Sequence, residues 1–264
     1  MLNKKKFPLV SIIMNCHNGE KFLEESLKSI FNQTYNNWEL IFWDNVSTDK
    51  SSMILKKYKD RRIKYFQAKK FEKLYKARNL ALKKSLGDYI CFLDTDDIWN
   101  KNFIEKHVKK IIDTNCNITY SKYFIQNEIN KKMYLNEKKK LPAGFITMHL
   151  LKKYTIGISA TLLNKKIFHN YKFDPKYNII GDFDFFLNLS LNEKFDPLQE
   201  PLATYRHHSK NFTNNNYDIY IDELKNWIKD NKSEFNKISN LNYIKINIFK
   251  LKIKKYMRFL FTNS

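Results

Sequence analysis

Short apolar runs alternate with segments of helical periodicity over the first hundred residues. Uninterrupted apolar runs of this length are typical of strands buried on both faces, whereas apolar residues three and four positions apart indicate helices. Such an alternation predicts a parallel sheet covered by helices. The expected strands are 9–14, 38–43, 62–66 and 89–93, and the expected helices are 21–32, 47–60 and 73–85.

The second half of the chain has a less regular pattern, and two further helices are expected after a break at 214–216. The elements expected before that break are strands at 118–123 and 156–163 and a helix at 182–192. The expected divisions are an α/β domain at 1–215, with halves at about 7–100 and 101–215, and a helical extension at 216–264.

The last expected helix has one apolar stripe, in which residues recur at alternating spacings of three and four. A basic amphipathic helix is typical of an element that binds an anionic membrane surface. Docking of the stripe against the α/β domain, or against a second subunit in an oligomer, is the alternative. The stripe is Ile246, Phe249, Ile253, Tyr256 and Leu260, and the basic residues mostly off it are Lys250, Lys252, Lys254, Lys255 and Arg258.

Polar residues follow three of the expected strands, at 15–18, 44–45 and 94–97. Ligands of α/β sheets bind beyond the carboxyl ends of the strands. The segment 94–97 reads Asp-Thr-Asp-Asp. Its three carboxylates repel one another and favour a bound cation, and oxygen ligands suit Mg²⁺ or Mn²⁺. The alternative is a solvated turn that caps a helix beginning near Asn100.

The composition excludes several classes of protein. Hydrophobic residues make up 43% and aromatic residues 16% of the 264 residues, which argues against a disordered chain. The net charge of +21 favours anionic partners. A nucleic-acid-binding protein would gather basic and aromatic residues on one face, whereas carboxylates stand at the strand ends here, so no nucleic-acid partner is expected.

The cysteines and the apolar runs indicate a cytoplasmic location. Cys16, Cys91 and Cys116 have neither the spacing of a zinc site nor an even number for disulfides. The apolar run 7–14 lacks a small-residue cleavage site and is interpreted as a strand. Nowhere does the sequence contain the ~18 apolar residues that a transmembrane helix needs.

Five segments together resemble the family 2 glycosyltransferases of GT-A fold, over roughly 8–213. Their order and spacing match the family pattern, which implies a Rossmann-like mixed sheet flanked by helices, with a C-terminal helical extension. The segments are Pro-Leu-Val-Ser-Ile-Ile at 8–13, Ser-Ile-Phe-Asn-Gln-Thr-Tyr at 29–35, Trp-Asp-Asn-Val-Ser-Thr-Asp at 43–49, Lys-Ala-Arg-Asn at 76–79, and 87–97, which ends in Asp-Thr-Asp-Asp.

The resemblance implies a pocket for a nucleotide-sugar donor. Asp44 matches the aspartate that accepts a hydrogen bond from N3–H of uracil or thymine. His17 stands where an aromatic residue packs on the base, with Asn18 beside it on the donor side. Arg78 matches an arginine on the nucleotide side, and Asp94 the ribose-contacting member of the DXD motif. A turn cap at Asp44 and a helix salt bridge at Arg78 are the structural alternatives.

Metal and catalytic residues are implied by the same resemblance. Asp96 matches the metal ligand, and His208 stands at the histidine of a Tyr-Arg-x-His segment that binds the metal or the diphosphate. Asp182 matches the catalytic base of a Glu-Asp motif, although Gly181 replaces its glutamate. Asp184 is an alternative base, for which stabilisation of a helix N-terminus is the competing role.

The expected function is therefore inverting, metal-dependent transfer from a UDP- or dTDP-sugar to an acceptor hydroxyl, in surface or lipid-linked glycan synthesis. The enzyme would be cytoplasmic or peripheral on the cytoplasmic membrane face. Processive synthases resemble it but carry a Gln-x-x-Arg-Trp motif and transmembrane helices, which are absent here. Two alternatives stay open: an inactive relative that binds nucleotide-sugar, and a sugar nucleotidyltransferase, which would need a glycine-rich basic loop after the first strand.

Overall fold

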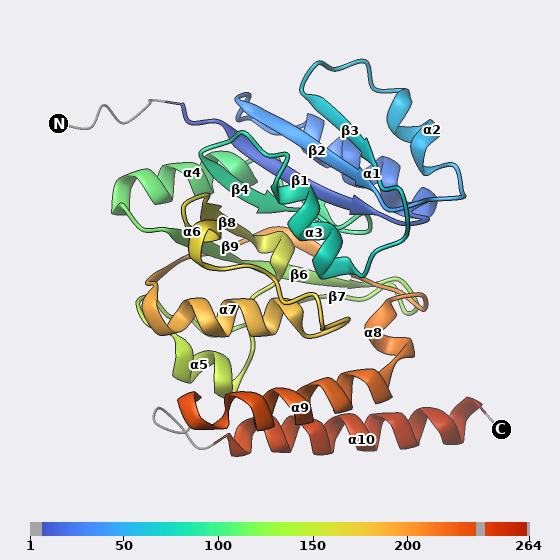
Figure 1. The fold of residues 1–264 in the computed structure, drawn as a ribbon, viewed down its shortest axis with the longest axis vertical. Helices are drawn as coiled ribbons and strands as arrows, with labels where there is room; N and C mark the ends of the chain where they lie inside the picture. Colours follow the sequence, from blue (N-terminus) through green and yellow to red (C-terminus); the bar gives the residue numbers. More distant parts are fainter. Residues whose placement is uncertain (1–6, 236–240, 263–264) are drawn as a thin grey trace.

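The computed structural model describes residues 7–235 and 241–262 as one mixed sheet between layers of helices (Figure 1). The strand order is β3-β2-β1-β4-β8-β6-β9-β5, and β7 pairs with β6. The strands are β1 (Val10–Cys16), β2 (Trp38–Asp44), β3 (Ile63–Gln67), β4 (Tyr89–Phe92), β5 (Ile98–Trp99), β6 (Ile118–Asn127), β7 (Met133–Leu135), β8 (Thr161–Asn164) and β9 (Phe195–His207).

The helices cover both faces of the sheet, and a pair of long helices lies at the foot of the molecule in Figure 1. They are α1 (Glu20–Phe31), α2 (Ser51–Lys56), α3 (Leu74–Leu82), α4 (Phe103–Thr114), α5 (Thr147–Lys152), α6 (Ile167–Asn170), α7 (Gly181–Asn192), α8 (Phe212–Asn215), α9 (Tyr217–Phe235) and α10 (Asn242–Thr262).

The predicted parallel half of the sheet is confirmed, because β1 pairs in parallel with both β2 and β4, and β2 with β3. Successive residues of these strands pack into different cores. Ile12 and Met14 of β1 face the core under α1 and α4, whereas Ile13 faces the core that includes α3 and α7. Burial on both faces explains why these strands are continuous apolar runs in the sequence.

The second half of the sheet was only partly predicted. β8 is antiparallel to both β4 and β6, whereas β9 runs parallel to β6. The long strand β9 had no prediction, because Pro197, Pro201 and its charged residues do not read as a strand. Register shifts in β6 around Lys122 accommodate the irregular pairing.

Two expected elements need correction. The helix expected at 47–60 is only α2, because 47–49 form a loop whose backbone is bonded by Asn18 and Asp44. The strand expected at 156–163 is β8, preceded by a 3₁₀ turn at Ile158–Ala160. Asn18 accepts backbone N–H bonds of the first segment, and the Trp99 indole N–H donates to the Ser159 carbonyl in the second. Local periodicity cannot reveal such distant partners.

The two C-terminal helices were expected, but α10 docks through a different stripe from the expected one. Ile244 and Ile248 are buried, and they join the core shared by α5, α7 and α9. Ile246 and Phe249 are exposed, at 49% and 63%. Leu260 and Arg258 lie outside the described side chains. The division of the chain near 215 stays a prediction.

Helix α9 is bonded directly to the segment that begins α7. Both carboxylate oxygens of Glu223 accept backbone N–H bonds there, from Asn178 at 2.6 Å, Ile179 at 3.0 Å and Ile180 at 3.1 Å. These donors precede a helix N-terminus, where backbone N–H groups have no intrahelical partner and a negative charge is favourable. No local pattern in the sequence predicts this cap.

We expect Glu223→Ala to lower the free energy of unfolding by about 2 kcal/mol, because it leaves several backbone donors without their acceptor. Asp222→Ala is the matched control, since the neighbouring Asp222 is exposed and forms an ion pair with Lys225, one turn on in the same helix. Its effect should stay within about 0.5 kcal/mol. Urea unfolding measures both variants, and equal effects would contradict the cap.

Candidate active site

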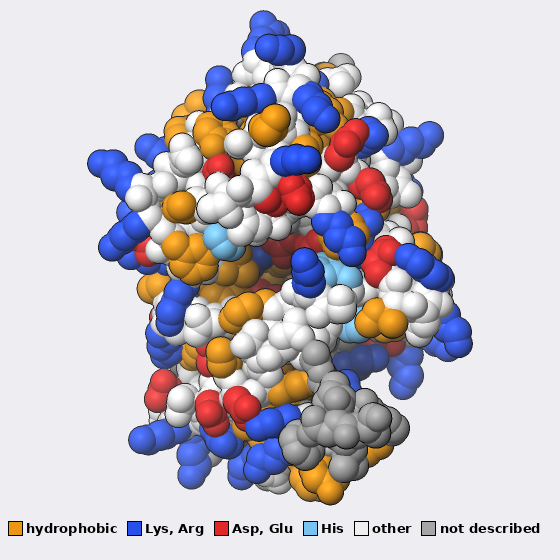
Figure 2. Space-filling model, turned by 90° about the vertical axis from the view of Figure 1, so that its right-hand side faces the viewer, with side chains coloured by type: hydrophobic (Ala, Val, Ile, Leu, Met, Phe, Trp, Pro, Cys, Tyr) orange, Lys and Arg blue, Asp and Glu red, His pale blue; other side chains and the backbone are white. Residues whose placement is uncertain are grey.

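The carboxyl ends of β1, β2 and β4 meet at one edge of the sheet, beside the first turn of α7 and the end of β9. Figure 2 shows this face, which is hollowed across its middle, with histidine and acidic side chains around the hollow. The predicted site residues Asp44, Asp94 and Asp96 follow or end these strands. The geometry of each one is fixed by partners from other elements.

Asp44 is buried at the last position of β2. Its Oδ1 accepts the backbone N–H of Ser47 at 2.8 Å, and its Oδ2 accepts the Tyr65 hydroxyl at 2.7 Å. Burial, together with the bond to Asp44, raises the pKa of Tyr65 to about 12, so Tyr65 remains a donor. Each oxygen of an ionised carboxylate can accept a second hydrogen bond. Asp44 can therefore accept one from a ligand while its own position stays fixed.

His17 and Asn18 follow β1 and have different surroundings. His17 is exposed, its ring packs edge-on against Phe71, and its Nδ1 donates to the Asn45 carbonyl at 2.9 Å. Asn18 has a φ of 56°, a conformation that asparagine tolerates, and its Oδ1 accepts the Thr48 N–H at 2.8 Å. Asn18 thus binds the loop after β2, and its contact with a donor stays a prediction.

Arg78 and Asp94 form an ion pair that joins α3 to the turn after β4. The Nη2 of Arg78 donates to Asp94 Oδ1 at 2.7 Å, and the arginine side chain is 3% exposed. Burial works against its charge, but Asp94 and then Tyr75 and Asp182 more than offset that effect and raise its pKa. The sequence alternative of a salt bridge within one helix is wrong, because the partner follows a strand.

Asp97 turns away from the hollow into the protein. It is buried, accepts the Ser159 hydroxyl at 2.6 Å through Oδ2, and accepts the Arg206 backbone N–H at 3.1 Å through Oδ1. Burial, followed by repulsion from Asp96 and Asp94, raises the pKa of Asp97 well above its usual range. Asp97 therefore supports the acidic turn from within.

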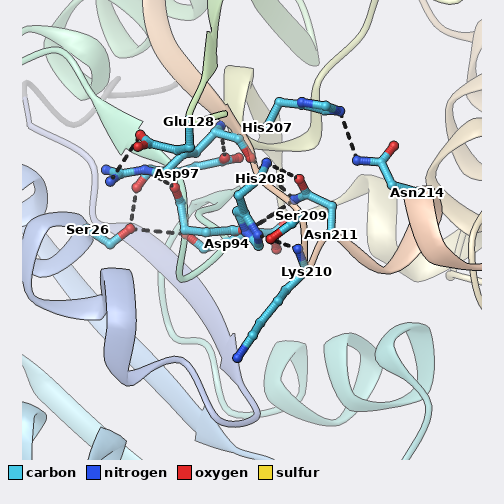
Figure 3. Close-up of polar contacts among 12 residues, drawn as sticks. Ser26, Asp94, Asp97, Glu128, His207, His208, Ser209, Lys210, Asn211 and Asn214 are labelled. Atoms are coloured by element: carbon cyan, nitrogen blue, oxygen red, sulfur yellow. Dashed lines mark hydrogen bonds and ion pairs between the residues drawn. The ribbon is translucent and has the colours of Figure 1, made fainter. Parts of the chain in front are cut away.

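Asp96 faces the residues that follow β9. Its Oδ2 lies 2.9 Å from His208 Nε2, and the Asn211 amide nitrogen lies 3.4 Å from the same oxygen. Figure 3 shows His208 and Asn211 together over the acidic turn. The backbone N–H of Lys210 donates to His208 Nδ1 at 3.2 Å, so Nδ1 is the acceptor and Nε2 bears the proton directed at Asp96. The imidazole is thereby oriented with Nε2 toward the carboxylate.

The donor set of this pair suits a divalent cation that is shared with a ligand. Among the described residues, no three histidine, cysteine or acidic side chains converge on one point. Asp96 and His208 would supply two ligands, and Mg²⁺ and Mn²⁺ commonly complete their coordination with water and substrate phosphates. Asp96 fits such a cation as it stands. His208 would be its second ligand through Nε2 in the tautomer that carries the proton on Nδ1, in which Nδ1 no longer accepts the Lys210 N–H.

Asp182 lies at the first turn of α7, partly buried, with Oδ1 3.2 Å from the Tyr75 hydroxyl and 2.9 Å from the Phe183 N–H. Burial raises its pKa, and Asp94 adds to this, although Arg78 opposes it. Asp184 has a structural position, because its Oδ1 accepts the Trp227 indole N–H at 2.9 Å on the side of α9.

The structure also brings to the site residues that had no predicted role. Tyr75 precedes Arg78 by three positions, which places both on one face of α3. Arg206 lies within the Tyr-Arg-x-His segment, and its Nε donates to the Asp96 carbonyl at 3.0 Å. Helical spacing to Arg78 was a usable signal for Tyr75. No sequence signal existed for Ser159, because its partner is sixty-two residues away.

The sequence model "Glycosyl transferase family 2" matches residues 11–182 of this chain. The chain belongs to glycosyl transferase family 2. This range includes the strands, the acidic turn and Asp182, whereas His208 lies beyond it.

Relatives of this family 2 glycosyltransferase include enzymes named for glycan synthesis. The chain is 33% identical over 186 residues to the Escherichia coli UDP-Glc:alpha-D-GlcNAc-diphosphoundecaprenol beta-1,3-glucosyltransferase WfgD, covering 69% of each chain. It is 34% identical over 118 residues to the Bacillus subtilis putative teichuronic acid biosynthesis glycosyltransferase TuaG, covering 44% of this chain and 47% of TuaG.

Solved structures confirm the GT-A fold. TarS 1-349 of S. aureus in complex with UDP has a TM-score of 0.63 at 19% identity, over 83% of this chain and 65% of that one. The mannosyltransferase PcManGT from Pyrobaculum calidifontis, in complex with GDP-Man and Mn²⁺, has a TM-score of 0.63 at 13% identity, over 85% of this chain and 65% of that one. Such low identities bear on the fold alone.

Proposed function

We propose that this chain transfers a sugar from a nucleoside diphosphate sugar to an acceptor hydroxyl, with inversion at the anomeric carbon. The observation that carries the proposal is the Asp96–His208 pair, whose atoms are 2.9 Å apart and whose aspartate is two residues after Asp94 of the Arg78–Asp94 pair. Asp44 ends β2 at the same edge of the sheet, and β1 lies between β2 and β4. The site therefore combines a hydrogen-bond acceptor for a nucleobase with groups suited to binding a diphosphate.

The donor that fits best is a uridine or thymidine diphosphate sugar. Asp44 accepts hydrogen bonds and cannot donate them when ionised, so it complements the N3–H of these bases. The name of WfgD specifies UDP-Glc, and TarS has been solved with UDP and with UDP-GlcNAc. GDP-Man in PcManGT shows that another base occurs on the same fold.

The leaving diphosphate needs its charge neutralised. A divalent cation bound by Asp96 and His208 would supply that charge and act as a Lewis acid toward the phosphate oxygens. Arg78 is bonded to Asp94 and keeps that carboxylate in place. His208 would bind the cation through Nε2, with its ring proton on Nδ1.

Asp182 is the proposed general base. The acceptor oxygen attacks the anomeric carbon, the bond from that carbon to the diphosphate oxygen breaks, and the acceptor proton passes to the Asp182 carboxylate. Attack from the side opposite the leaving group inverts the anomeric centre. Burial raises the pKa of Asp182, which makes its ionised form a stronger base.

The proposed acceptor is a glycan or a lipid-linked sugar, and the exposed face of α10 supports work at an anionic membrane surface. The apolar side chains Ile246, Phe249, Ile253 and Tyr256 are all exposed there. Seven-residue spacing places Lys245 and Lys252 along one side of them, and four-residue spacing places Lys250 and Lys254 along the other.

Two rows of lysines beside an apolar stripe complement anionic headgroups and the acyl boundary beneath them. The same rows would face one another if a second copy docked on this stripe, and like charges oppose such a contact. No helix among residues 7–235 and 241–262 is long and apolar enough to cross a bilayer. The lipid part of the acceptor in the name of WfgD also favours a membrane partner. A cytoplasmic location stays a prediction.

Calorimetric titration with UDP, dTDP, GDP and their sugar conjugates tests the donor site. We expect uridine or thymidine diphosphates to bind most tightly, and we expect tight binding to require Mn²⁺. Asp96→Ala should remove the Mn²⁺ effect and weaken binding at least roughly tenfold, the lower end of what even outer-shell partners of a metal contribute. Asp113→Ala, on the exposed side of α4, is the control. Equal behaviour of the two variants would refute the site.

Asp182→Asn should lower the transfer rate by roughly 10²–10⁴, the range of a general base, and leave donor affinity unchanged. Asp184→Asn is the matched variant, because asparagine can still accept the Trp227 N–H. It should retain transfer. If only Asp184→Asn lost transfer, Asp184 rather than Asp182 would be the general base. A wild-type chain that binds donor but transfers nothing under any condition would be an inactive relative, as Gly181 allows.

Cosedimentation with phosphatidylglycerol vesicles tests the membrane face. Each lysine near an anionic surface contributes about 1 kcal/mol, so Lys250→Gln with Lys254→Gln should weaken binding roughly thirtyfold. Lys56→Gln with Lys57→Gln makes the same charge change on and beside α2 and should have little effect. Equal losses, or binding to neutral vesicles alone, would contradict the proposal. Self-association at low salt without vesicle binding would assign the stripe to a second copy.

A further inference from the structure

Gly181 is in contact with the face of a tyrosine ring from another helix. A Cβ atom built on Gly181 would lie 2.5 Å from Cδ2 and from Cε2 of Tyr75. Real Cβ atoms do not approach other heavy atoms this closely, so any larger residue at 181 requires the ring to move. The glycine and the tyrosine are therefore a matched pair.

The Tyr75 ring has little freedom to move. The side chain is 2% exposed, its ring stacks on Phe173 with centroids 5.8 Å apart, and the Arg78 guanidinium lies 5.5 Å from its centroid. Its hydroxyl proton is shared between two acceptors, the Ile179 carbonyl at 2.7 Å and Asp182 Oδ1 at 3.2 Å. The ring thus fixes a phenol group between the segment before α7 and the acidic side chain at its start.

Tyr75 and Arg78 are three positions apart on α3, so they project from the same face of that helix. Tyr75 contacts Asp182, and Arg78 donates to Asp94 at 2.7 Å. One turn of α3 therefore contacts both Asp182, at the acceptor end of the hollow, and Asp94, at the donor end.

We propose that Tyr75 is a positioning residue for the base Asp182, that the absence of a side chain at Gly181 exists to admit its ring, and that Tyr75 and Arg78 together set the distance between Asp182 and Asp94. This inference rests on the proposed role of Asp182. It gives a physical reason for the glycine that replaces the glutamate of the Glu-Asp motif. The Tyr75 ring from α3 occupies the space that a side chain at 181 would need.

Other ionisable groups also face Asp182 and act on its charge. Arg78 favours the ionised carboxylate and Asp94 disfavours it, while three further tyrosines surround it from β6, from the segment after α5 and from α9. These are Tyr123, Tyr154 and Tyr220. The Tyr154 hydroxyl is buried without a hydrogen-bond partner among the described residues, which makes it a matched comparison for Tyr75.

The test is Tyr75→Phe, which retains the ring against Gly181 and removes only the hydroxyl. We expect kcat to fall roughly 10–100-fold, as for the loss of a hydrogen bond to a charged group, with the affinity for nucleotide-sugar unchanged. Removing a donor disfavours the ionised carboxylate. The acidic limb of the pH profile of kcat should therefore move to higher pH, a change that a merely structural role would not cause.

Tyr154→Phe is the control and should leave kcat and its pH profile unchanged. Gly181→Ala, which displaces the ring, should reproduce the Tyr75→Phe profile. In the Asp182→Asn background, Tyr75→Phe should have no further effect on the rate, because residues acting as a unit are not additive.

The outcomes separate the two proposals. An inactive Asp182→Asn with a wild-type rate and profile for Tyr75→Phe overturns the positioning role and leaves the base assignment intact. An active Asp182→Asn overturns the base itself. A Tyr75→Phe variant that slows the Asp182→Asn enzyme further also overturns the positioning role, since its effect would then not pass through Asp182.

Discussion

The ion pair between Arg78 and Asp94 is the interaction on which the site depends. A guanidinium that is 3% exposed needs a charged partner, because burial alone disfavours its charge. The pair joins α3 to the turn after β4, and α3 in turn brings Tyr75 against Asp182. Helix α3 thereby links the turn after β4, through Arg78, to the first turn of α7, through Tyr75.

The acidic turn shows how three neighbouring carboxylates coexist. Asp94 faces Arg78, Asp96 faces His208, and Asp97 accepts bonds from Ser159 and from the backbone of β9. Their partners come from three different parts of the chain, so mutual repulsion is relieved by separate means. Two of the three are directed at the hollow, and the third is built into the protein. In the sequence they looked alike.

The C-terminal helices have two distinct roles in the structure. Helix α9 is part of the framework of the site, because Glu223 accepts the backbone N–H groups before α7 and Trp227 donates to Asp184. Helix α10 buries one stripe against α5 and α9 and exposes another. If the exposed stripe of α10 binds a membrane, α9 connects that surface to α7, the helix that bears Asp182 in its first turn.

The sequence by itself determined the parallel half of the sheet and the position of the acidic turn, because strands buried on both faces must be apolar throughout and polar residues mark their ends. It also determined the family, since five segments matched in order. Only the tertiary structure decided that β9 is a strand, which stripe of α10 is buried, and that the Tyr75 ring leaves no room for a side chain at residue 181. Each of these depends on contacts between residues distant along the chain, such as the Tyr75 ring over Gly181, and no local periodicity records them.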